Sequence, residues 1–234
     1  MKINKKILID FLNKIKMTGS QEISECILRF NPEGMNIITK SATNQSMISG
    51  VLHSGVFKEY EEIDNVGIND FPNVVKVIDR FDDVISLDKK GNLLILTGAS
   101  KKAEIELIEE KFLPNDVKLP ELDFEEKFEL PSAKLHEMVK DSKMNKDFVL
   151  TLKTGKDKVI LSNTGKYKFT TELEAKGCTG GNKVDFGQPF VDAINSFDGT
   201  LEMQIKTDYP IQISETTNNS TITLIVAPRV GDEE

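Results

Sequence analysis

A proline-bounded connector lies at the midpoint of the 234-residue chain and reads Phe112-Leu113-Pro114-Asn115-Asp116-Val117-Lys118-Leu119-Pro120-Glu121-Leu122-Asp123-Phe124. Its two prolines exclude a continuous helix, and Pro120 restricts Leu119 to an extended backbone. We therefore expect this segment to run extended over a surface. On both sides of it the chain follows the same plan of helices and strands, which predicts a domain at 1–112, a connecting loop at 113–123 and a second domain at 124–234.

Composition excludes several classes of protein. Hydrophobic residues make up 38% and charged residues 29% of the chain, and no apolar run approaches the roughly 18 residues needed to cross a bilayer. Polar residues interrupt the N-terminal apolar stretch, so a signal peptide is not expected. Cys26 and Cys178 lie in different halves without partners at metal-ligand spacing, which indicates buried thiols in a reducing compartment. The net charge of −8 argues against a nucleic-acid partner unless basic residues gather on one surface.

The first half contains two amphipathic helices whose exposed faces are largely basic. Apolar periodicity predicts the first helix over 5–16, with Asp10 interrupting a face that carries Lys6, Lys14 and Lys16. The second helix is predicted over 70–81. It places Lys76 and Arg80 four positions apart on one face, opposite its apolar stripe.

The strands of the first half follow from two-residue alternation and turn signatures. Asn31-Pro32-Glu33-Gly34 and Asp88-Lys89-Lys90-Gly91-Asn92 are typical of hairpin turns. Alternating apolar residues predict strands at 23–30, 35–40, 46–52, 58–63, 84–87, 93–97 and 102–109. The last of these has one polar face, as expected at a sheet edge.

The second half repeats this plan. A helix over 132–142 turns His136, Lys140 and Lys143 away from its apolar stripe, and a fourth helix is predicted over 188–197. The fourth helix places Gln188, Asp192 and Asn195 opposite its apolar residues and carries no lysine or arginine there. Strands are predicted at 124–130, 148–153, 158–162, 166–174, 184–186, 201–206, 211–214 and 222–226.

The duplication is visible at individual residues. The second helix of each half ends in Phe-Asp, at Phe81-Asp82 and Phe197-Asp198, a spacing of 116 residues that is close to half the chain. Each pair is followed by strand, turn and strand. Two such copies predict an α+β architecture, with paired helices packed on mainly antiparallel sheets.

With the second half laid out, its end resembles a known family. The segment Lys206-Thr207-Asp208-Tyr209-Pro210-Ile211-Gln212-Ile213, a polar turn, and then Leu224-Ile225-Val226-Ala227-Pro228-Arg229-Val230 are similar to the end of sliding clamps of the proliferating cell nuclear antigen (PCNA) type. Leu119-Pro120-Glu121-Leu122-Asp123-Phe124-Glu125 resembles the exit of that family's interdomain connecting loop, and Gly34-Met35-Asn36-Ile37 resembles an early hairpin. The resemblance spans the whole chain in order and spacing.

The resemblance implies a duplicated DNA clamp fold and a homotrimeric ring that encircles duplex DNA without reading its sequence. Such a clamp is a processivity factor in DNA replication and repair that tethers a DNA polymerase and is loaded by a separate clamp loader. Diffuse phosphate contacts suit a protein that slides. The candidate DNA-facing residues are Lys6, Lys14, Lys16, Lys76, Arg80, Lys134, Lys140, Lys143 and Lys146. For His136, the residues leave both a phosphate contact and an ordinary surface position open.

The resemblance also implies a hydrophobic pocket for short partner peptides and two strands that join subunits. The pocket positions are Val117, Leu119, Pro210, Ala227 and Pro228, with Lys40 where the family often has a large apolar residue. The subunit strands are Ala103 to Glu109 and Tyr167 to Leu173 of the next copy. Their candidate contact residues are Ala103, Ile105, Leu107, Tyr167, Phe169, Thr171 and Leu173.

No catalytic or metal constellation is present in the sequence, and we expect no cofactor. The stretch Gly177-Cys178-Thr179-Gly180-Gly181 lacks the lysine and following helix of a phosphate-binding loop, which favours a turn. A non-enzymatic clamp at replicating DNA is therefore expected, in the cytoplasm of a prokaryote or an infected host cell or in a nucleus, without a membrane partner. The alternative is a duplicated β-rich structural or assembly protein with no DNA role; an enzyme is a third reading.

Overall fold

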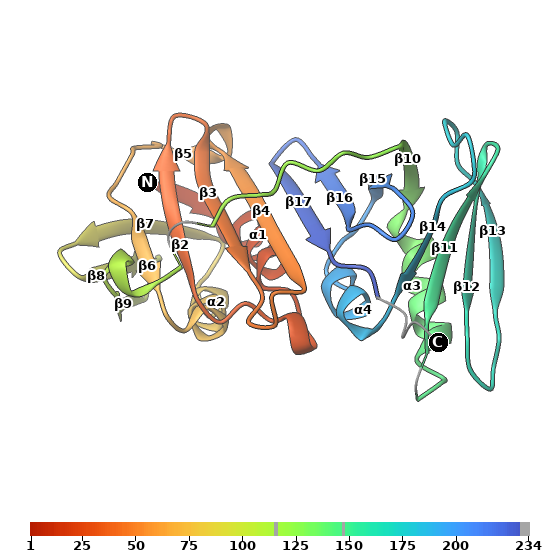
Figure 1. Cartoon of the computed structure of the whole chain (residues 1–234). Helices are drawn as coiled ribbons and strands as arrows, with labels where there is room; N and C mark the ends of the chain where they lie inside the picture. Colours follow the sequence, from red (N-terminus) through yellow and green to blue (C-terminus); the bar gives the residue numbers. More distant parts are fainter. Residues whose placement is uncertain (115–116, 147, 230–234) are drawn as a thin grey trace. The chain divides into compact units, whose positions relative to one another are not determined.

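The computed structural model of the protein describes residues 1–114, 117–146 and 148–229 (Figure 1). Connector positions 115–116 and the last five positions of the expected second domain lie outside the described residues, as does position 147. The chain forms two compact units. The first comprises Met1–Met17, Glu22–Leu119 and Thr216–Ile222, and the second comprises Thr18–Gln21, Pro120–Glu215 and the chain from Thr223 onward.

The first unit contains two helices and two runs of antiparallel strands. Its elements in chain order are β1 (Lys2–Asn4), α1 (Lys5–Lys16), β2 (Cys26–Asn31), β3 (Gly34–Lys40), β4 (Ser46–His53), β5 (Phe57–Lys58), β6 (Val66–Ile68), α2 (Phe71–Asp79), β7 (Val84–Lys90), β8 (Leu93–Thr97) and β9 (Lys102–Glu106). Neighbouring strands follow the order β5-β1-β7-β8-β9 in one sheet and β4-β3-β2-β6 in the other. Short 3₁₀ turns complete it at η2 (Ser54–Val56) and η3 (Glu110–Phe112).

The second unit repeats the arrangement. Its elements are η1 (Gly19–Gln21), β10 (Glu126–Pro131), α3 (Ser132–Ser142), β11 (Leu150–Gly155), β12 (Lys158–Asn163), β13 (Thr170–Glu174), β14 (Lys183–Phe186), α4 (Gln188–Ile194), β15 (Thr200–Ile205), β16 (Ile211–Thr216) and β17 (Ser220–Val226), of which the part from Thr223 belongs to this unit. Its strand orders are β10-β15-β16-β17 and β13-β12-β11-β14.

The two sets of strand orders correspond element by element. β1-β7-β8-β9 of the first unit matches β10-β15-β16-β17 of the second, and β4-β3-β2-β6 matches β13-β12-β11-β14. In both units a helix follows the first strand directly, and a second helix precedes the last three strands. The duplicated α+β fold predicted from the sequence is confirmed.

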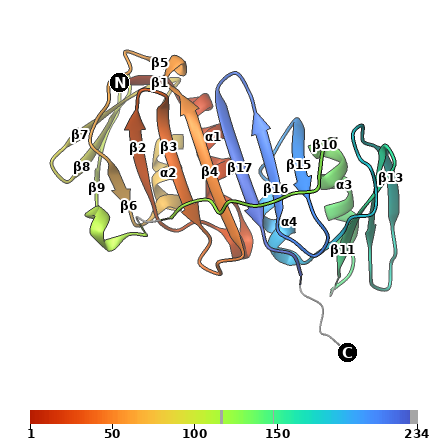
Figure 2. The same cartoon turned by 45° about the horizontal axis from the view of Figure 1, so that its top comes forward.

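The apolar stripes of the helices form the core of each unit. Leu8, Phe11, Leu12 and Ile15 of α1 are buried, as the periodicity predicts, and both helices of the first unit lie against one face of its strands (Figure 2). Gly50 in β4 allows this close packing, because a Cβ atom there would lie 2.5 Å from Cδ1 of Ile15. A larger residue at this position would separate the helix from the sheet.

Local signals place the helix starts well and several strand ends poorly. α1 and α3 have the predicted bounds, because Asn4 caps Lys6 N at 2.8 Å and Ser132 follows a proline. The predicted strand 58–63 is wrong: β5 ends at Lys58, since Glu59 takes a left-handed backbone with φ of 60°, and the chain resumes pairing only at β6. The fourth helix stops at Ile194, short of the predicted end.

Candidate functional site

The basic residues predicted on the first unit lie on the outer sides of α1 and α2. Lys6 is exposed and pairs with Asp10 at 2.5 Å, while Lys14 and Lys16 are half-buried. Lys76 and Arg80 are exposed, with Arg80 directly after α2. Lys5 was not among the predicted DNA-facing residues; its ammonium donates to the backbone oxygen of Asp79 at 3.1 Å and so joins the two helices.

The second unit carries its basic residues along α3 and just beyond it. Lys134, Lys140, Lys143 and Lys146 are all exposed. Lys134 pairs with Glu137 at 3.0 Å, whereas no described residue pairs with the other three. Nε2 of His136 lies 3.1 Å from the Ile194 oxygen, so this ring is engaged with α4 and half-buried. The ring thus connects α3 to α4, and a phosphate contact of His136 stays a prediction.

Of the three polar residues opposite the apolar side of the fourth helix, Gln188 and Asn195 are exposed but Asp192 is buried. Asp192 is only 8% exposed, and Thr18 Oγ1 donates to its backbone oxygen at 2.8 Å. The helix packs against η1 in the same unit. A lysine at position 192 would be unfavourable, because its charged amine would be buried there without a partner.

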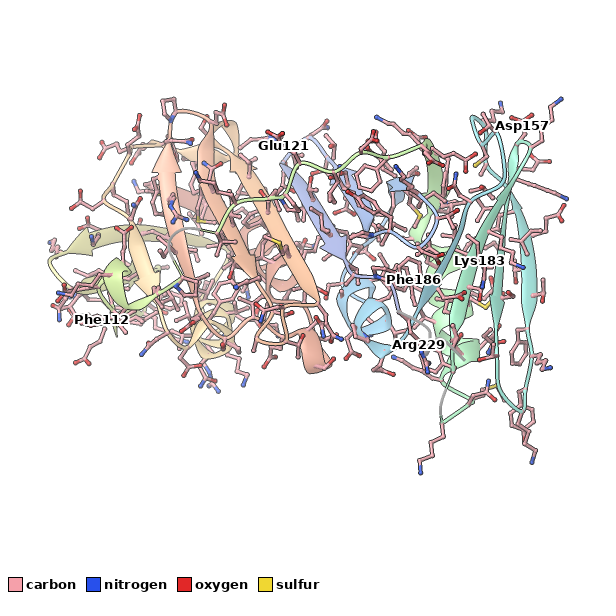
Figure 3. The ribbon with its side chains drawn as sticks, in the orientation of Figure 1. Phe112, Glu121, Asp157, Lys183, Phe186 and Arg229 are labelled. Carbon is pink, nitrogen blue, oxygen red and sulfur yellow. The ribbon has the colours of Figure 1, made fainter. Side chains whose placement is uncertain are left out.

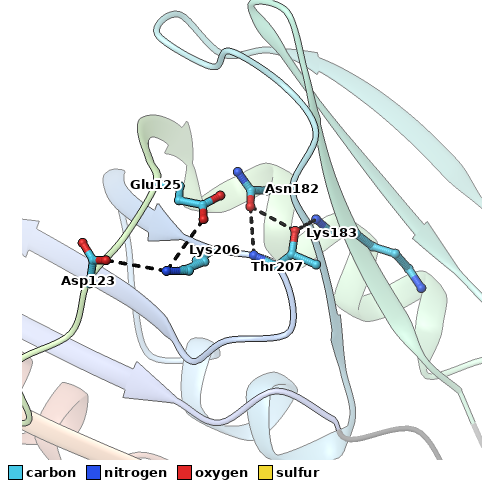
Figure 4. Close-up of polar contacts among 6 residues, drawn as sticks. All are labelled: Asp123, Glu125, Asn182, Lys183, Lys206 and Thr207. Carbon is cyan, nitrogen blue, oxygen red and sulfur yellow. Dashed lines mark hydrogen bonds and ion pairs between the residues drawn. The ribbon is translucent and has the colours of Figure 1, made fainter. Parts of the chain in front are cut away.

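The end of the connector is fixed to the second unit by polar and aromatic contacts (Figure 4). The ammonium of Lys206 lies 3.6 Å from a carboxylate oxygen of Asp123 and 3.7 Å from one of Glu125. The ring of Tyr209 meets Phe124 edge-on, with centroids 6.0 Å apart. Lys206 and Tyr209 lie in the loop between β15 and β16 and hold the end of the connector against the second unit. Neither residue was predicted to have this role.

The same loop is also held by Asn182 and by Lys183, the first residue of β14. Asn182 Oδ1 accepts hydrogen bonds from Thr207 N at 2.8 Å and Thr207 Oγ1 at 3.0 Å, and Lys183 N donates to Thr207 Oγ1 at 3.2 Å (Figure 4). Pro210 follows this loop and is half-buried. These hydrogen bonds fix the loop that leads to Pro210.

The chain after β17 lies at the same end of the β16–β17 hairpin as Pro210, because hairpin strands run antiparallel. Ala227 is exposed and Pro228 half-buried. Arg229 N donates to the backbone oxygen of Asp185 at 2.7 Å, and Arg229 Nη1 donates to the backbone oxygen of Phe148 at 3.4 Å. Three of the five expected pocket residues thus gather at one end of the second unit. The connector residues Val117 and Leu119, half-buried in the first unit, remain a prediction.

The two predicted subunit strands are both terminal in their sheets. β9 ends the order β5-β1-β7-β8-β9, and β13 begins the order β13-β12-β11-β14. Both strands alternate exposed and half-buried residues along their whole length, with Ala103 and Ile105 half-buried in β9 and Thr171 and Leu173 in β13. Among the described residues, each has a partner strand on one side alone.

Both strands are shorter than predicted. β9 ends at Glu106: Leu107 N still donates to Asn92 O at 2.8 Å in the same register, but Ile108 N donates to Gly67 O at 3.1 Å, so the chain leaves β8 there. β13 begins at Thr170, so Tyr167 and Phe169 lie in the preceding loop instead of the strand. Asn145 holds that loop: its Oδ1 accepts from Tyr167 N at 2.9 Å and its Nδ2 donates to Tyr167 O at 2.8 Å.

The glycine-rich stretch after β13 binds a carboxylate of the chain itself. Gly177, Gly180 and Gly181 have positive φ values, and the loop points backbone N–H groups at Glu126. Glu126 Oε1 accepts hydrogen bonds from Thr179 N at 2.8 Å, Thr179 Oγ1 at 2.7 Å and Gly180 N at 2.6 Å. Burial raises the pKa of Glu126, but hydrogen bonds to the carboxylate outweigh burial and lower the pKa to about 2. The stretch is a turn, as predicted, and its inward N–H groups bind the Glu126 carboxylate.

Comparison with curated proteins finds relatives over nearly the full chain. The chain is 26% identical over 240 residues to the DNA polymerase sliding clamp of Cenarchaeum symbiosum, which covers 95% of this chain and 96% of that protein. It is 22% identical over 246 residues to the DNA polymerase sliding clamp of Methanococcus vannielii, covering 94% and 96%. No family model matches the chain.

Solved structures agree with these relatives. A structure of the C-terminal region of FEN-1 bound to A. fulgidus PCNA matches 99% of this chain and 98% of that chain, with a TM-score of 0.86 and 15% identity. The PCNA of Entamoeba histolytica matches 98% of each chain with a TM-score of 0.83 and 16% identity. The chain is thus similar over nearly its full length to DNA polymerase sliding clamps in sequence and to PCNA structures in fold. The alternative of a β-rich structural or assembly protein is not favoured.

The described residues provide no support for a metal site, a membrane-spanning helix or a reactive thiol. No group of three histidine, cysteine, aspartate or glutamate side chains among the described residues could hold a metal ion. No described helix is long and apolar enough to cross a membrane. Both cysteines are buried, and burial raises the pKa of the Cys178 thiol to about 11, so this thiol is unreactive at neutral pH.

Proposed function

We propose that three copies of this clamp assemble head to tail into a ring that encircles duplex DNA and holds a DNA polymerase on it. The observation that carries the proposal is the full-length similarity to proteins named DNA polymerase sliding clamps. The terminal strands β9 and β13 support a head-to-tail contact, because a contact between different edges repeats from copy to copy and closes when its rotation is right. The domain boundaries 1–112 and 124–234 belong to the same proposal.

The DNA-facing surface in this proposal is made by α1, α2 and α3. Their exposed or half-buried cations are Lys6, Lys14, Lys16, Lys76, Arg80, Lys134, Lys140, Lys143 and Lys146. Flexible lysines that contact phosphates without reading bases suit a ring that must move along the duplex. α4 contributes no cation, since its sequence contains no lysine or arginine.

Partner proteins are proposed to bind by short peptides at the end of the second unit formed by Pro210, Ala227 and Pro228, with Val117 and Leu119 of the connector as further contacts. A PCNA of similar fold has been solved with the C-terminal region of FEN-1 bound, which supports this mode of binding. The partners would include polymerase, clamp loader and other proteins carrying the glutamine-hydrophobic-aromatic clamp motif. Lys40 is exposed, and we still predict that it alters which peptides the clamp prefers.

The clamp is proposed to act without catalysis of its own and without a cofactor, inside the cell at replicating DNA. The first test is the solution mass by light scattering over a dilution series. A mass three times that of the 26.2 kDa chain is expected, together with retention on circular but not on linear DNA after loading. A monomer at every concentration that also fails to bind clamp-motif peptides would contradict the proposal.

A further inference from the structure

A cavity of about 410 Å³ opens in the first unit where the start of β6, the turn between β7 and β8 and the segment 107–111 after β9 meet. Ile108 N donates to Gly67 O at 3.1 Å, which fixes that segment beside β6 (Figure 1). Phe112 follows directly, is 64% exposed and projects from the first unit (Figure 3). A cavity of this volume is large enough for a small ligand or for a side chain of a partner.

Lys89 lines this cavity from an inward-facing position of β7. Ile85 and Leu87 precede it on the same face of the strand and are buried, and its cross-strand partner Leu94 is buried as well. Only 19% of the Lys89 side chain is exposed. The alternation of the strand therefore predicts an apolar side chain at position 89, where the chain has a cation.

The ammonium of Lys89 is poorly compensated within the chain. It lies 3.8 Å from a carboxylate oxygen of Asp64, whose side chain is 92% exposed. Within the part of the chain that the structure describes, Lys89 has no other ion pair or hydrogen bond. A half-buried ammonium loses hydration, and one solvent-exposed carboxylate restores little of it. An anionic group bound in the cavity would supply the missing partner.

Carboxylates lie at the wall and the rim of the same cavity. The Glu109 side chain is 69% exposed and pairs with Lys111 at 2.6 Å. Glu110 is half-buried, and its Oε2 accepts a hydrogen bond from Asn65 Nδ2 at 3.1 Å. These carboxylates would repel a multiply charged phosphate on entry. A single carboxylate followed by a cation complements both the interior and the rim.

We propose that this cavity is a second docking site, which binds a partner peptide through an acidic side chain on Lys89 and an adjacent basic side chain on Glu109 and Glu110. Phe112 offers an apolar surface to the residues that follow in the peptide. The cavity lies toward β6 and the β7–β8 turn, whereas the free edge of β9 lies on the side away from β8. The inference therefore depends neither on the proposed ring nor on the clamp-motif site at the end of the second unit.

Two blocked dipeptides test the charge pattern. N-acetyl-glutamyl-lysine amide carries one carboxylate beside one ammonium, and N-acetyl-glutaminyl-lysine amide lacks the carboxylate. Titrated into the isotope-labelled full chain and followed by NMR, the first dipeptide should saturably shift the amide signals of Gly91, Asn92 and Glu109. The second should bind roughly tenfold more weakly or less, and Lys89→Gln should reduce the affinity for the first by a similar factor.

Lys90→Gln is the matched control, because Lys90 is the next residue of β7 and its side chain is 71% exposed. This variant should bind the first dipeptide like the wild type. Lys89→Met should fold and raise the midpoint of thermal unfolding by about 2 °C or more, since an apolar side chain suits the inward position. A lower midpoint would assign Lys89 to the stability of the fold and overturn the inference.

Lys89→Gln should leave the solution mass and the affinity for clamp-motif peptides unchanged, so this inference can fail while the proposed function stands. A changed mass would place Lys89 in a contact between copies and overturn the docking site. Equal binding of the two dipeptides, or equal affinity of Lys89→Gln and the wild type for the first, would overturn it as well. Loss of binding confined to Lys89→Gln and to the dipeptide without a carboxylate is the expected result.

Discussion

Ser20 donates two hydrogen bonds to one carboxylate oxygen of Asp192, from its backbone nitrogen at 2.9 Å and from its hydroxyl at 2.8 Å. Gln188 Nε2 donates to the other oxygen at 2.7 Å. The carboxylate is buried and satisfied, although it lies opposite the apolar residues of α4. This relationship separates α4 from the three lysine-bearing helices, because its polar side stabilises the fold.

Asp192→Ala should therefore destabilise the clamp without changing its affinity for DNA. It removes the acceptor for three side-chain and backbone donors in a buried place, and we expect the free energy of unfolding to fall by about 1–3 kcal/mol. Urea unfolding at neutral pH measures the loss. Asp64→Asn, which neutralises a carboxylate that is 92% exposed, is the control and should change stability little. An equal effect of both changes would refute the role of Asp192.

Glu126 should make the free energy of unfolding depend on pH in the acidic range. Its pKa is lowered from 4.5 to about 2, so its stabilisation is complete above pH 4.5 and is lost as the pH falls toward 2. Glu126→Gln should reduce the free energy of unfolding by about 2–3 kcal/mol at pH 7. Its deficit relative to the wild type should shrink between pH 4.5 and 2. Urea titrations across this range test the sign, and a deficit that is the same at pH 3 and pH 7 would contradict it.

Reversal of Lys76 and Arg80 to glutamate should weaken DNA contact without unfolding the chain, because both side chains are exposed. Each phosphate contact contributes about −0.9 to the slope of log affinity against log salt, so the slope for duplex DNA should fall in magnitude by about 2. Fluorescence anisotropy over a salt series measures it. Lys153→Glu with Lys176→Glu, two exposed lysines away from the helices, provides the control. An unchanged slope and unchanged processivity would remove α2 from the DNA surface.

Ala227→Asp should reduce binding of clamp-motif peptides. It adds a charge at an exposed position beside the half-buried Pro228, where we propose an apolar anchor to lie. Burying the new carboxylate would cost affinity, which should fall roughly tenfold or more. Titration of a labelled peptide gives the dissociation constant, and Glu129→Gln on the exposed side of β10 is the control. Equal affinity of both variants would place the peptide elsewhere.

Lys206→Ala should weaken peptide binding less and through a different cause. Lys206 pairs with Asp123 at the end of the connector and with Glu125 just after it. Its substitution leaves the side chains of Pro210 and Ala227 in place. A connector that is no longer held must be ordered on binding, which should reduce affinity about two- to fivefold. The difference from wild type should diminish at high salt, because exposed ion pairs are screened. A loss that is independent of salt would indicate a direct contact instead.

The sequence by itself determined the elements that depend on neighbours along the chain. The apolar stripe of α1 and the alternation along β3 and β4 are local patterns, and each appears in the structure at the predicted place. The duplication follows for the same reason, since Phe81-Asp82 and Phe197-Asp198 repeat a local plan. The resemblance at the chain's end agrees with the full-length similarity to proteins named DNA polymerase sliding clamps.

Only the tertiary structure decided which polar groups meet. The partners of Asp192, Glu126 and Lys206 lie 172, 53 and 83 residues away, as Ser20, Thr179 and Asp123. No periodicity carries such pairings, because they depend on how loops fold back onto strands and helices. The ends of β9 and β13 were missed for this reason too: hydrogen bonds from Ile108 to Gly67 and from Tyr167 to Asn145 draw each chain away from its edge. Distant backbone and side-chain hydrogen bonds, more than local propensity, thus decided where the functional edges of this clamp begin and end.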